Sequence, residues 1–308
     1  MRRYPNNIRC GRCSESTTFA AGTSIEGDIV SGIVAKDLHQ RLGSLAGRAY
    51  IGTSGWDYDG WAEAFYGGRP KKDWLRFCAE KFSAIEVNAT FYRLQSRETF
   101  RRWRDETPLQ FRFAIKANRY LTHNKKLNDP LPAIRLERER ACALGAKLAA
   151  VVWQLPHNLH RNLERLTRFA QALRSWQRVR HAIEFRHASW IDEEVAACLR
   201  EHRIAVCQSD AADWPLWDAV TTDFVYVRLH GHEMTYASGY SEAQLRAWAA
   251  KLRRWLREGR DAHVYFDNDA LGYAPRNAAR LLALVRAFDS TDFRGTQSET
   301  RAYRKCMV

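Results

Sequence analysis

The chain has 308 residues, of which 45% are hydrophobic, enough for one or two domains with a sizeable core. Its formal net charge of +14 and pI near 9.7 favour anionic partners, such as phosphorylated metabolites or nucleic acid. The sequence has no apolar run of the ~18 residues that a membrane span needs, and no secretory signal opens it. We therefore expect a cytoplasmic protein without a membrane partner.

Three parts are expected along the chain. Residues 1–47 are rich in Ser, Thr and Gly and predict a flexible leader, in which Cys10 and Cys13 form a single CxxC pair, half of a zinc site. Residues 48–288 form the predicted domain, and 289–308 a polar tail. The leader carries six Lys/Arg against four Asp/Glu, and the tail four against three. Most of the positive charge therefore belongs to the domain.

Eight short runs rich in β-branched and aromatic residues predict strands. They lie at 48–52, 84–88, 111–116, 149–154, 181–185, 204–208, 224–230 and 262–266. Helical patterns separate most of them, which favours a parallel sheet. Eight such units over roughly 240 residues predict an α/β fold, a (β/α)8 TIM-barrel-like single domain. A doubly wound open sheet is the alternative, although no Gly-rich phosphate loop follows the first strand.

Six helical patterns lie between these strands. They cover residues 71–82, 96–106, 135–148, 163–176, 192–202 and 241–259. Ser96 lies three residues before Thr99, which is the spacing of an N-cap. Ser241 and Gln244 have the spacing of a capping box.

Alternation within each strand predicts which side chains face the barrel axis. Ile85 and Val87 are expected to face helices, whereas Glu86 and Asn88 face the axis. Polar residues occupy the carboxyl-terminal end of nearly every strand, where barrels carry their active sites. The predicted mouth holds Glu86, Asn88, Lys116, Gln154, Glu184, Arg186, Arg228, His230 and Asp267.

We expect this mouth to bind an anionic, phosphate-bearing ligand and to carry out acid–base or hydrolytic chemistry on it. Glu184, Glu86 and His230 are the candidate catalytic residues, because burial and neighbouring charges tune such groups toward neutral pH. The expected substrate-binding residues are Asn88, Lys116, Gln154, Arg186, Arg228, Asp267, Tyr92 and Ser54. As an enzyme, the protein would be a hydrolase or lyase acting on a phosphorylated substrate, and the sequence leaves its cofactor and oligomeric state open.

Other functions compete with this hypothesis. A nucleic-acid-binding protein, with or without metal-dependent phosphodiester cleavage, would use the arginine-rich helices and exposed aromatic rings. A non-catalytic barrel would use the charges of the mouth only as a structural ion-pair network. A glycosidase could use Glu86 and Glu184 as its two carboxylates, but three cations in the mouth disfavour a neutral sugar. A metal ion is a further possibility, for which Glu86, Glu184, Asp210, His230 and Asp267 are acceptable ligands. The three cations would repel a divalent ion, so no metal site is predicted.

Several segments carry a family resemblance. They are YIGTSGWDYDGW (50–61), FSAIEVNATFYRLQSRETFRRWRDETPLQFRFAIKANRYLTH (82–123), EFRHASW (184–190), YVRLHG (226–231) and YFDNDALGYAPRNAARL (265–281). Together they resemble the YecE-like family, known as domain of unknown function 72. The resemblance covers about 48–285 and implies a TIM-barrel-like fold without an established activity. The chain departs from the family pattern with Lys-Ala-Asn at 116–118, where Lys-Ala-Pro is usual, and with Phe-Asp-Asn at 266–268, where Phe-Asn-Asn is usual.

Overall fold

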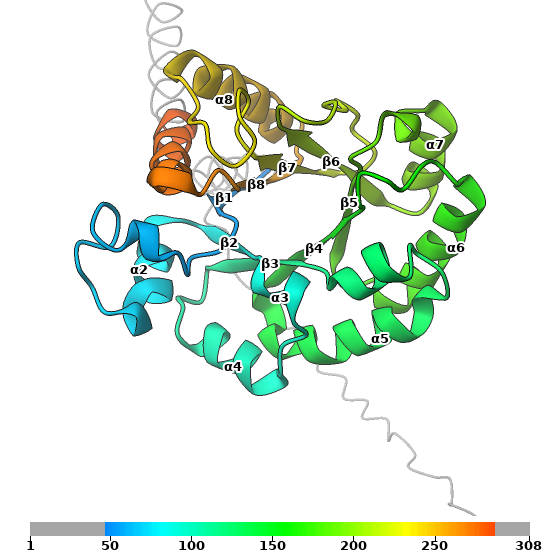
Figure 1. Cartoon of the computed structure of the whole chain (residues 1–308), viewed down its shortest axis with the longest axis horizontal. Coiled ribbons are helices and arrows are strands. Elements are labelled where there is room, and N and C mark those ends of the chain that lie inside the picture. The colour runs from blue at the N-terminus through cyan, green and yellow to red at the C-terminus, as the bar shows by residue number, and fades with distance from the viewer. Residues whose placement is uncertain (1–46, 287–308) are drawn as a thin grey trace, which may run out of the picture. The chain divides into compact units, whose positions relative to one another are not determined.

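A computed structural model of the chain describes residues 47–286. Eight parallel strands form one sheet in the order β1-β8-β7-β6-β5-β4-β3-β2 (Figure 1). The strands are β1 (Ala49–Thr53), β2 (Ala84–Val87), β3 (Arg112–Lys116), β4 (Leu148–Gln154), β5 (Arg180–Glu184), β6 (Ile204–Asp210), β7 (Phe224–Leu229) and β8 (Asp261–Phe266). The predicted TIM-barrel-like fold is confirmed. The predictions for residues 1–46 and 287–308, including the pair Cys10 and Cys13, lie outside the described residues.

The barrel is nearly closed at the seam between β1 and β2. A parallel bridge joins Ser54 to Glu86, and the backbone N–H of Gly55 donates to the carbonyl of Glu86 at 2.7 Å. Gly52 permits this close approach, since a Cβ at that position would lie 1.8 Å from the carbonyl oxygen of Ala84. The absent side chain at residue 52 therefore allows the two edge strands to meet.

Helices surround the sheet (Figure 1). They are α2 (Trp74–Lys81), α3 (Ala89–Tyr92), α4 (Arg97–Asp105), α5 (Pro130–Ala141), α6 (Leu163–Leu173), α7 (Glu193–Glu201), α8 (Glu242–Arg257) and a last helix over 273–286. Short helical turns are η1 (Asp59–Trp61), η2 (Lys71–Asp73), η3 (Tyr120–Asn124), η4 (Cys142–Lys147), η5 (Arg174–Trp176), η6 (Ala188–Trp190) and η7 (Ala270–Gly272). The connection from β6 to β7, residues 211–223, contains no helix.

Both predicted helix starts are confirmed. The Ser96 hydroxyl accepts the N–H of Thr99 at 3.2 Å, and Ser241 forms a full capping box with Gln244. Helix α5 begins earlier than predicted, at Pro130, because proline fits the first turn of a helix.

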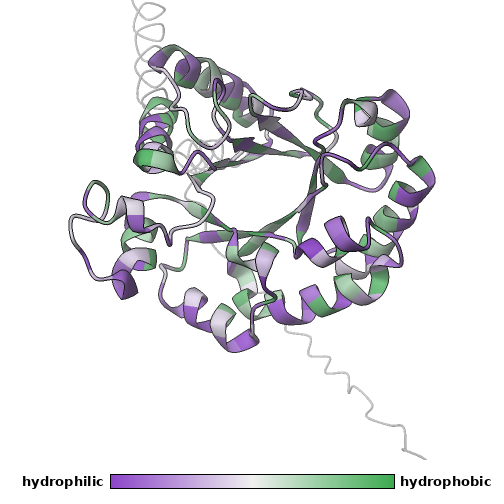
Figure 2. Cartoon of the chain, viewed as in Figure 1, coloured by the Kyte–Doolittle hydropathy of each residue, from purple (hydrophilic) through white to green (hydrophobic). Residues whose placement is uncertain are grey.

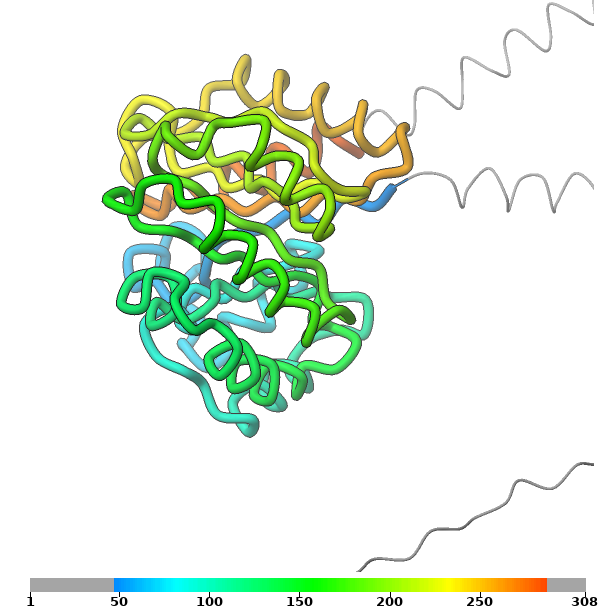
Figure 3. The backbone as a smooth tube through the Cα atoms, turned by 90° about the vertical axis from the view of Figure 1, so that its right-hand side faces the viewer, coloured from blue at the N-terminus to red at the C-terminus, as the bar shows by residue number. Residues whose placement is uncertain are grey.

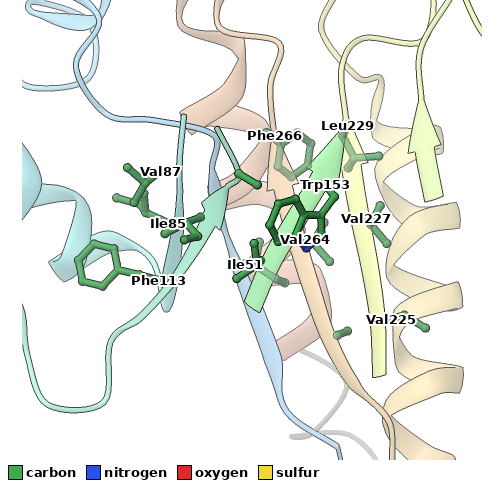
Figure 4. Close-up of a cluster of buried hydrophobic side chains, with 14 of the residues drawn as sticks. Ile51, Ile85, Val87, Phe113, Trp153, Val225, Val227, Leu229, Val264 and Phe266 are labelled. Carbon is green, nitrogen blue, oxygen red and sulfur yellow. The ribbon is translucent and has the colours of Figure 1, made fainter. Parts of the chain in front are cut away.

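An outer apolar layer fills the space between the strands and the helices. Figure 4 labels members of this layer on the strands, among them Ile51, Ile85, Val227 and Val264. In Figure 2 the surrounding helices carry hydrophobic and hydrophilic residues side by side, as amphipathic helices do. Every second residue of a strand belongs to this layer, so the residues between them must face the barrel axis.

Inside the barrel, small and large residues complement each other. Strands β2 to β6 contribute the buried alanines Ala84, Ala114, Ala150, Ala182 and Ala205. Strands β1, β7 and β8 contribute the rings Tyr50, Phe224, Tyr226, His263 and Tyr265. The rings of Tyr50 and His263 stack with centroids 4.7 Å apart. This packing closes the interior beneath the mouth, so the barrel is a filled core.

The mouth is the end at which the parallel strands finish. In Figure 3 the β1 segment, drawn in blue, runs from right to left, so the carboxyl-terminal ends of the strands lie on the left. In β6 the alternation alone is ambiguous, and the structure resolves it: Cys207 packs in the inner cluster, whereas Val206 belongs to the outer layer. Within residues 47–286, no helix is both long enough and apolar enough to cross a membrane.

Candidate functional site

An ion-pair network centred on Arg228 forms the floor of the mouth. The Arg228 side chain is fully buried, and its guanidinium lies 2.8 Å from a Glu86 oxygen, 2.6 Å from a Glu184 oxygen and 2.7 Å from an Asp267 oxygen. Strand β7 aims this side chain at the axis, because its neighbours Val227 and Leu229 face the outer layer. Three carboxylates around one guanidinium leave negative charge that other cations of the mouth must balance.

Glu86 is held on all sides below the mouth. The Ser54 hydroxyl donates to its Oε1 at 2.5 Å, and the Tyr226 hydroxyl donates to its Oε2 at 2.6 Å. The Arg228 Nε lies 3.0 and 3.1 Å from the two oxygens. Glu86, Ser54 and Tyr226 are all fully buried. In this position Glu86 anchors Arg228, and neither Glu86 nor Ser54 is open to a ligand.

Glu184 links the buried floor to a second arginine. Its Oε1 accepts the Nε–H of Arg186 at 2.8 Å, while its Oε2 faces Arg228. Burial opposes ionisation of Glu184, but the charges of Arg228 and Arg186 prevail and hold its pKa well below the usual range. Glu184 is therefore a permanent anion that orients Arg186.

Arg186 keeps hydrogen-bonding capacity that the protein does not use. Its guanidinium carbon lies 4.0 Å from the ring centroid of Trp214, which fixes the plane of the group. Its Nη2 is buried and has no hydrogen-bond partner within residues 47–286. A buried N–H group without a partner is costly, so a ligand that brought an acceptor to this donor would be stabilised by it.

His230 lies between two carboxylates. Its Nδ1 is 3.0 Å from an Asp267 oxygen, and its Nε2 is 3.6 Å from a Glu184 oxygen. Burial and the nearby Arg228 lower the pKa of His230, although both carboxylates oppose this shift. We therefore expect a neutral imidazole at pH 7. Its full burial makes it a neighbour of the site and not a group exposed to a ligand.

Lys116 ends β3 at the mouth. Its side chain is only 5% exposed, and its Nζ lies 4.0 Å from the ring centroid of Phe91. Lys116 forms no ion pair with the described residues, unlike Arg186 and Arg228. Burial and the charge of Arg228 lower the pKa of Lys116 to about 8. At neutral pH this amine can give up its proton far more readily than an exposed lysine.

A cavity of about 290 Å³ opens beside Arg186. It is lined by His123, Lys126, Gln154, Pro156, His157, Asn158 and Arg186. The lining contains two cations and two histidines but no carboxylate, which gives it an excess of positive charge. Burial, together with the charges of Arg119, Lys116 and Arg186, lowers the pKa of His123 to about 4, so this histidine is neutral. The cavity suits an anion.

A larger cavity, of about 830 Å³, lies at the seam of the barrel. Asn88 and the 66% exposed Tyr92 line it, and the Asn88 Oδ1 is buried without a partner in the described chain. Asp269 also lines it, and burial together with Asp267 raises the pKa of Asp269 to about 6. The lining holds three acids and three bases, so this cavity has no preference for one sign of charge.

The acids of the mouth gather around the Arg228 guanidinium and not around a position open to a metal ion. Within residues 47–286, no group of three or more His, Cys, Asp or Glu is placed to hold a metal ion. Asp210, at the end of β6, pairs instead with His232, whose Nδ1 lies 2.9 Å away.

Several residues of the site were not predicted from the sequence. His123 lies in the π-helical turn η3, and Trp214 in the helix-free connection between β6 and β7. Neither segment has a periodic pattern that would assign its side chains to the mouth. Tyr226 could have been found, because it shares the inward face of β7 with Arg228. Asp269 follows β8 by three residues, beyond the alternation of the strand.

Comparisons with known proteins agree with this architecture. The model of a family described as "Protein of unknown function DUF72" matches residues 50–300, further than the 285 expected from the motifs. The UPF0759 protein YunF of Bacillus subtilis is 24% identical over 269 residues, which cover 77% of this chain and 94% of the relative.

Two solved structures have a similar fold. A DUF72 family protein from Thermotoga maritima gives a TM-score of 0.67 at 25% identity, covering 78% of this chain and 99% of its own. A DUF72 family protein from Enterococcus faecalis gives 0.68 at 18% identity, covering 77% and 95%.

Proposed function

We propose a function for this chain from the premise that it belongs to the DUF72 family, whose activity is unknown. The barrel mouth binds a small anionic ligand, phosphate-bearing by preference, in the cavity beside Arg186. Lys116 does not line that cavity, and it would exchange a proton with a ligand that extends past the lining toward the end of β3. The protein is accordingly an enzyme of the acid–base type, and Glu184 and Arg228 position its reactive groups without touching the ligand.

The observation that carries the proposal is the free Nη2 of Arg186. Arg228 also faces the mouth, but its N–H groups already donate to carboxylates, so few of its donors remain for a ligand. Arg186 lines the cavity, donates its Nε–H to Glu184 and has a buried Nη2 without an acceptor. An oxyanion that accepts from this edge would satisfy a buried donor, and charge-assisted bonds of this kind are among the strongest.

Lys116 is the group of the mouth best suited to move a proton. Glu184 and Asp267 both have pKa values well below the usual range, because burial is overcome by Arg228, so neither picks up a proton near pH 7. The pKa of Lys116, near 8, lies close to the operating pH, where general acid–base catalysis is most effective. Of the residues first expected to be catalytic, Glu184 is retained as a positioning residue, and Glu86 and His230 as parts of the buried support.

A paired thermal-shift experiment tests the ligand class. The full chain is heated with glycerol 3-phosphate and with glycerol, then with other phosphorylated metabolites and their dephosphorylated forms. A ligand at ~100 times its Kd adds about 2.7 kcal/mol to the free energy of unfolding. We expect stabilisation only by phosphorylated members, lost in Arg186→Gln and kept in Arg168→Gln, which alters an exposed arginine paired with Glu164. Equal stabilisation of wild type and Arg186→Gln would refute the placement.

Nucleic acid is the alternative occupant, but the arginines of α4, one of the helices that suggested it, are paired with neighbouring acids. In α4, Arg101 pairs with Glu98 at 3.2 Å and Arg104 pairs with Asp105 at 2.7 Å. Such interleaved charges are typical of a solvated helix face. Repeating the thermal-shift experiment with short DNA and RNA, and with the metabolites, at low and high salt separates the two classes, because binding along a phosphate backbone weakens steeply with salt.

A further inference from the structure

The end of the barrel opposite the mouth holds a basic cavity of about 430 Å³. Arg112 and Arg180 are the first residues of β3 and β5, so their side chains enter at the amino-terminal end of the sheet. Arg178 and Arg203 join them from the connecting loops. Two aspartates, Asp223 and Asp261, also line the cavity, so four cations face two anions there.

The four arginines are unequally engaged. Arg180 is committed to Asp261, whose Oδ2 lies 2.6 Å from its Nη1. The Arg112 Nη1 donates to two backbone carbonyls, at 3.0 and 3.1 Å, and the other nitrogens of its guanidinium remain available to a ligand. The side chains of Arg178 and Arg203 make no hydrogen bond or ion pair with any residue in the range 47–286. Two whole guanidinium groups are therefore available to a ligand.

Arg203 occupies a backbone position that favours glycine. It follows His202, the C-cap of α7, and has a φ of 54°, in the left-handed region. Glycine or asparagine is usual just after a helix, because a larger side chain costs free energy there. Arg203 therefore adds a charge to the cavity at a site where glycine would give a more relaxed backbone.

The cavity is separate from the mouth. Tyr50 and Phe224 line it, and they pack with Tyr226 and Tyr265 in the filled interior of the barrel. None of the residues of the mouth lines this cavity. We propose that this cavity is a second anion site, which binds a multivalent oxyanion of the phosphate or pyrophosphate type between Arg112, Arg178 and Arg203.

Calorimetric titration of the full chain with pyrophosphate at constant ionic strength tests this site. The Arg186→Gln background removes binding at the mouth, so the heat that remains reports the amino-terminal cavity. In that background we expect pyrophosphate to bind at one site. Adding Arg178→Gln and Arg203→Gly should lower the affinity for pyrophosphate about 100-fold, about tenfold for each arginine.

Folding is checked separately. Arg203→Gly relaxes the left-handed residue, so it should not lower the Tm of the unliganded protein, and any loss of binding then belongs to the missing guanidinium. Two results would overturn the proposal. One is a triple variant that binds pyrophosphate within threefold of the Arg186→Gln background, and the other is an Arg186→Gln protein that binds neither pyrophosphate nor phosphate.

Discussion

Arg228 and Arg186 look equivalent in the sequence, yet their surroundings give them different roles. Each follows an apolar run and precedes a histidine by one or two positions. Arg228 is fully buried among three carboxylates, whereas Arg186 pairs with Glu184 alone and keeps a free donor. Pairing across a barrel depends on strand register and on side chains from distant strands, so the sequence could assign both residues to the mouth but could not tell them apart.

Replacing Arg228 by methionine should be strongly destabilising. The variant leaves Glu86, Glu184 and Asp267 buried without their shared cation, and breaking a buried pair in this way costs about 3–5 kcal/mol. Urea unfolding followed by circular dichroism measures the loss. Arg168→Met on the surface of α6 is the control and should change the free energy of unfolding by less than about 0.5 kcal/mol. A loss below about 1 kcal/mol for Arg228→Met would contradict the central place of this network.

Lys116 should make stability depend on pH in the alkaline range. Its pKa is about 8 in the folded protein and about 10.4 in the unfolded chain, so between these values the unfolded state binds more protons. Stability of the wild type should therefore rise with pH from 8 to 10.4, by about 3 kcal/mol, relative to Lys116→Met. Chemical unfolding of both proteins across this range measures the difference. A difference that stays constant with pH would show that Lys116 has an ordinary pKa.

At the scale of elements, the strands and helix caps were predictable and the connections were not. All eight strands lie within two residues of their predicted ends, because alternation and β-branched runs are local signals. The turn η3 and the connection 211–223 lack such signals, yet they bring His123 and Trp214 to the site. The ligand contacts of a barrel come largely from its loops, which explains why the fold was easier to predict than the site.

The seam between β1 and β2 should depend on Gly52. In Gly52→Ala the new methyl group would lie 1.8 Å from the carbonyl oxygen of Ala84, so the strands must separate. We expect a loss of about 3 kcal/mol or more, measured by urea unfolding. Gly60→Ala is the matched control, since a Cβ there meets nothing within 4 Å. Equal stability of the two variants would mean that the seam does not need this close approach.

Helix α5 is tied to the loop after β3 by a buried acid. Glu137 accepts the backbone N–H of Asn118 at 3.1 Å, and burial raises its pKa to about 7. A raised carboxyl pKa stabilises the fold at low pH and loses that effect as pH rises from about 4.3 to about 7. The stability of the wild type relative to Glu137→Gln should fall across that window and then level off. Thermal unfolding between pH 4 and 8 measures this, and a flat difference would contradict it.

For the whole molecule, the filled interior separates two ends with different chemistry. Aromatic rings from three strands pack against alanines from five, so the charged groups of the mouth rest on an apolar core. The sequence alone located the polar end of the barrel because polar residues close nearly every strand. It could not locate the basic cavity at the other end, whose arginines come from strand starts and loops far apart in the chain.

The central claim is that an oxyanion binds the free edge of Arg186. A crystal structure of the full chain with the phosphorylated ligand that stabilises it most tests this directly. We predict a phosphate oxygen within about 3 Å of the Arg186 Nη2, the distance of a charge-assisted hydrogen bond, with the ligand filling the cavity lined by His123 and Gln154. A ligand bound elsewhere, with Arg186 still lacking an acceptor, would contradict the account.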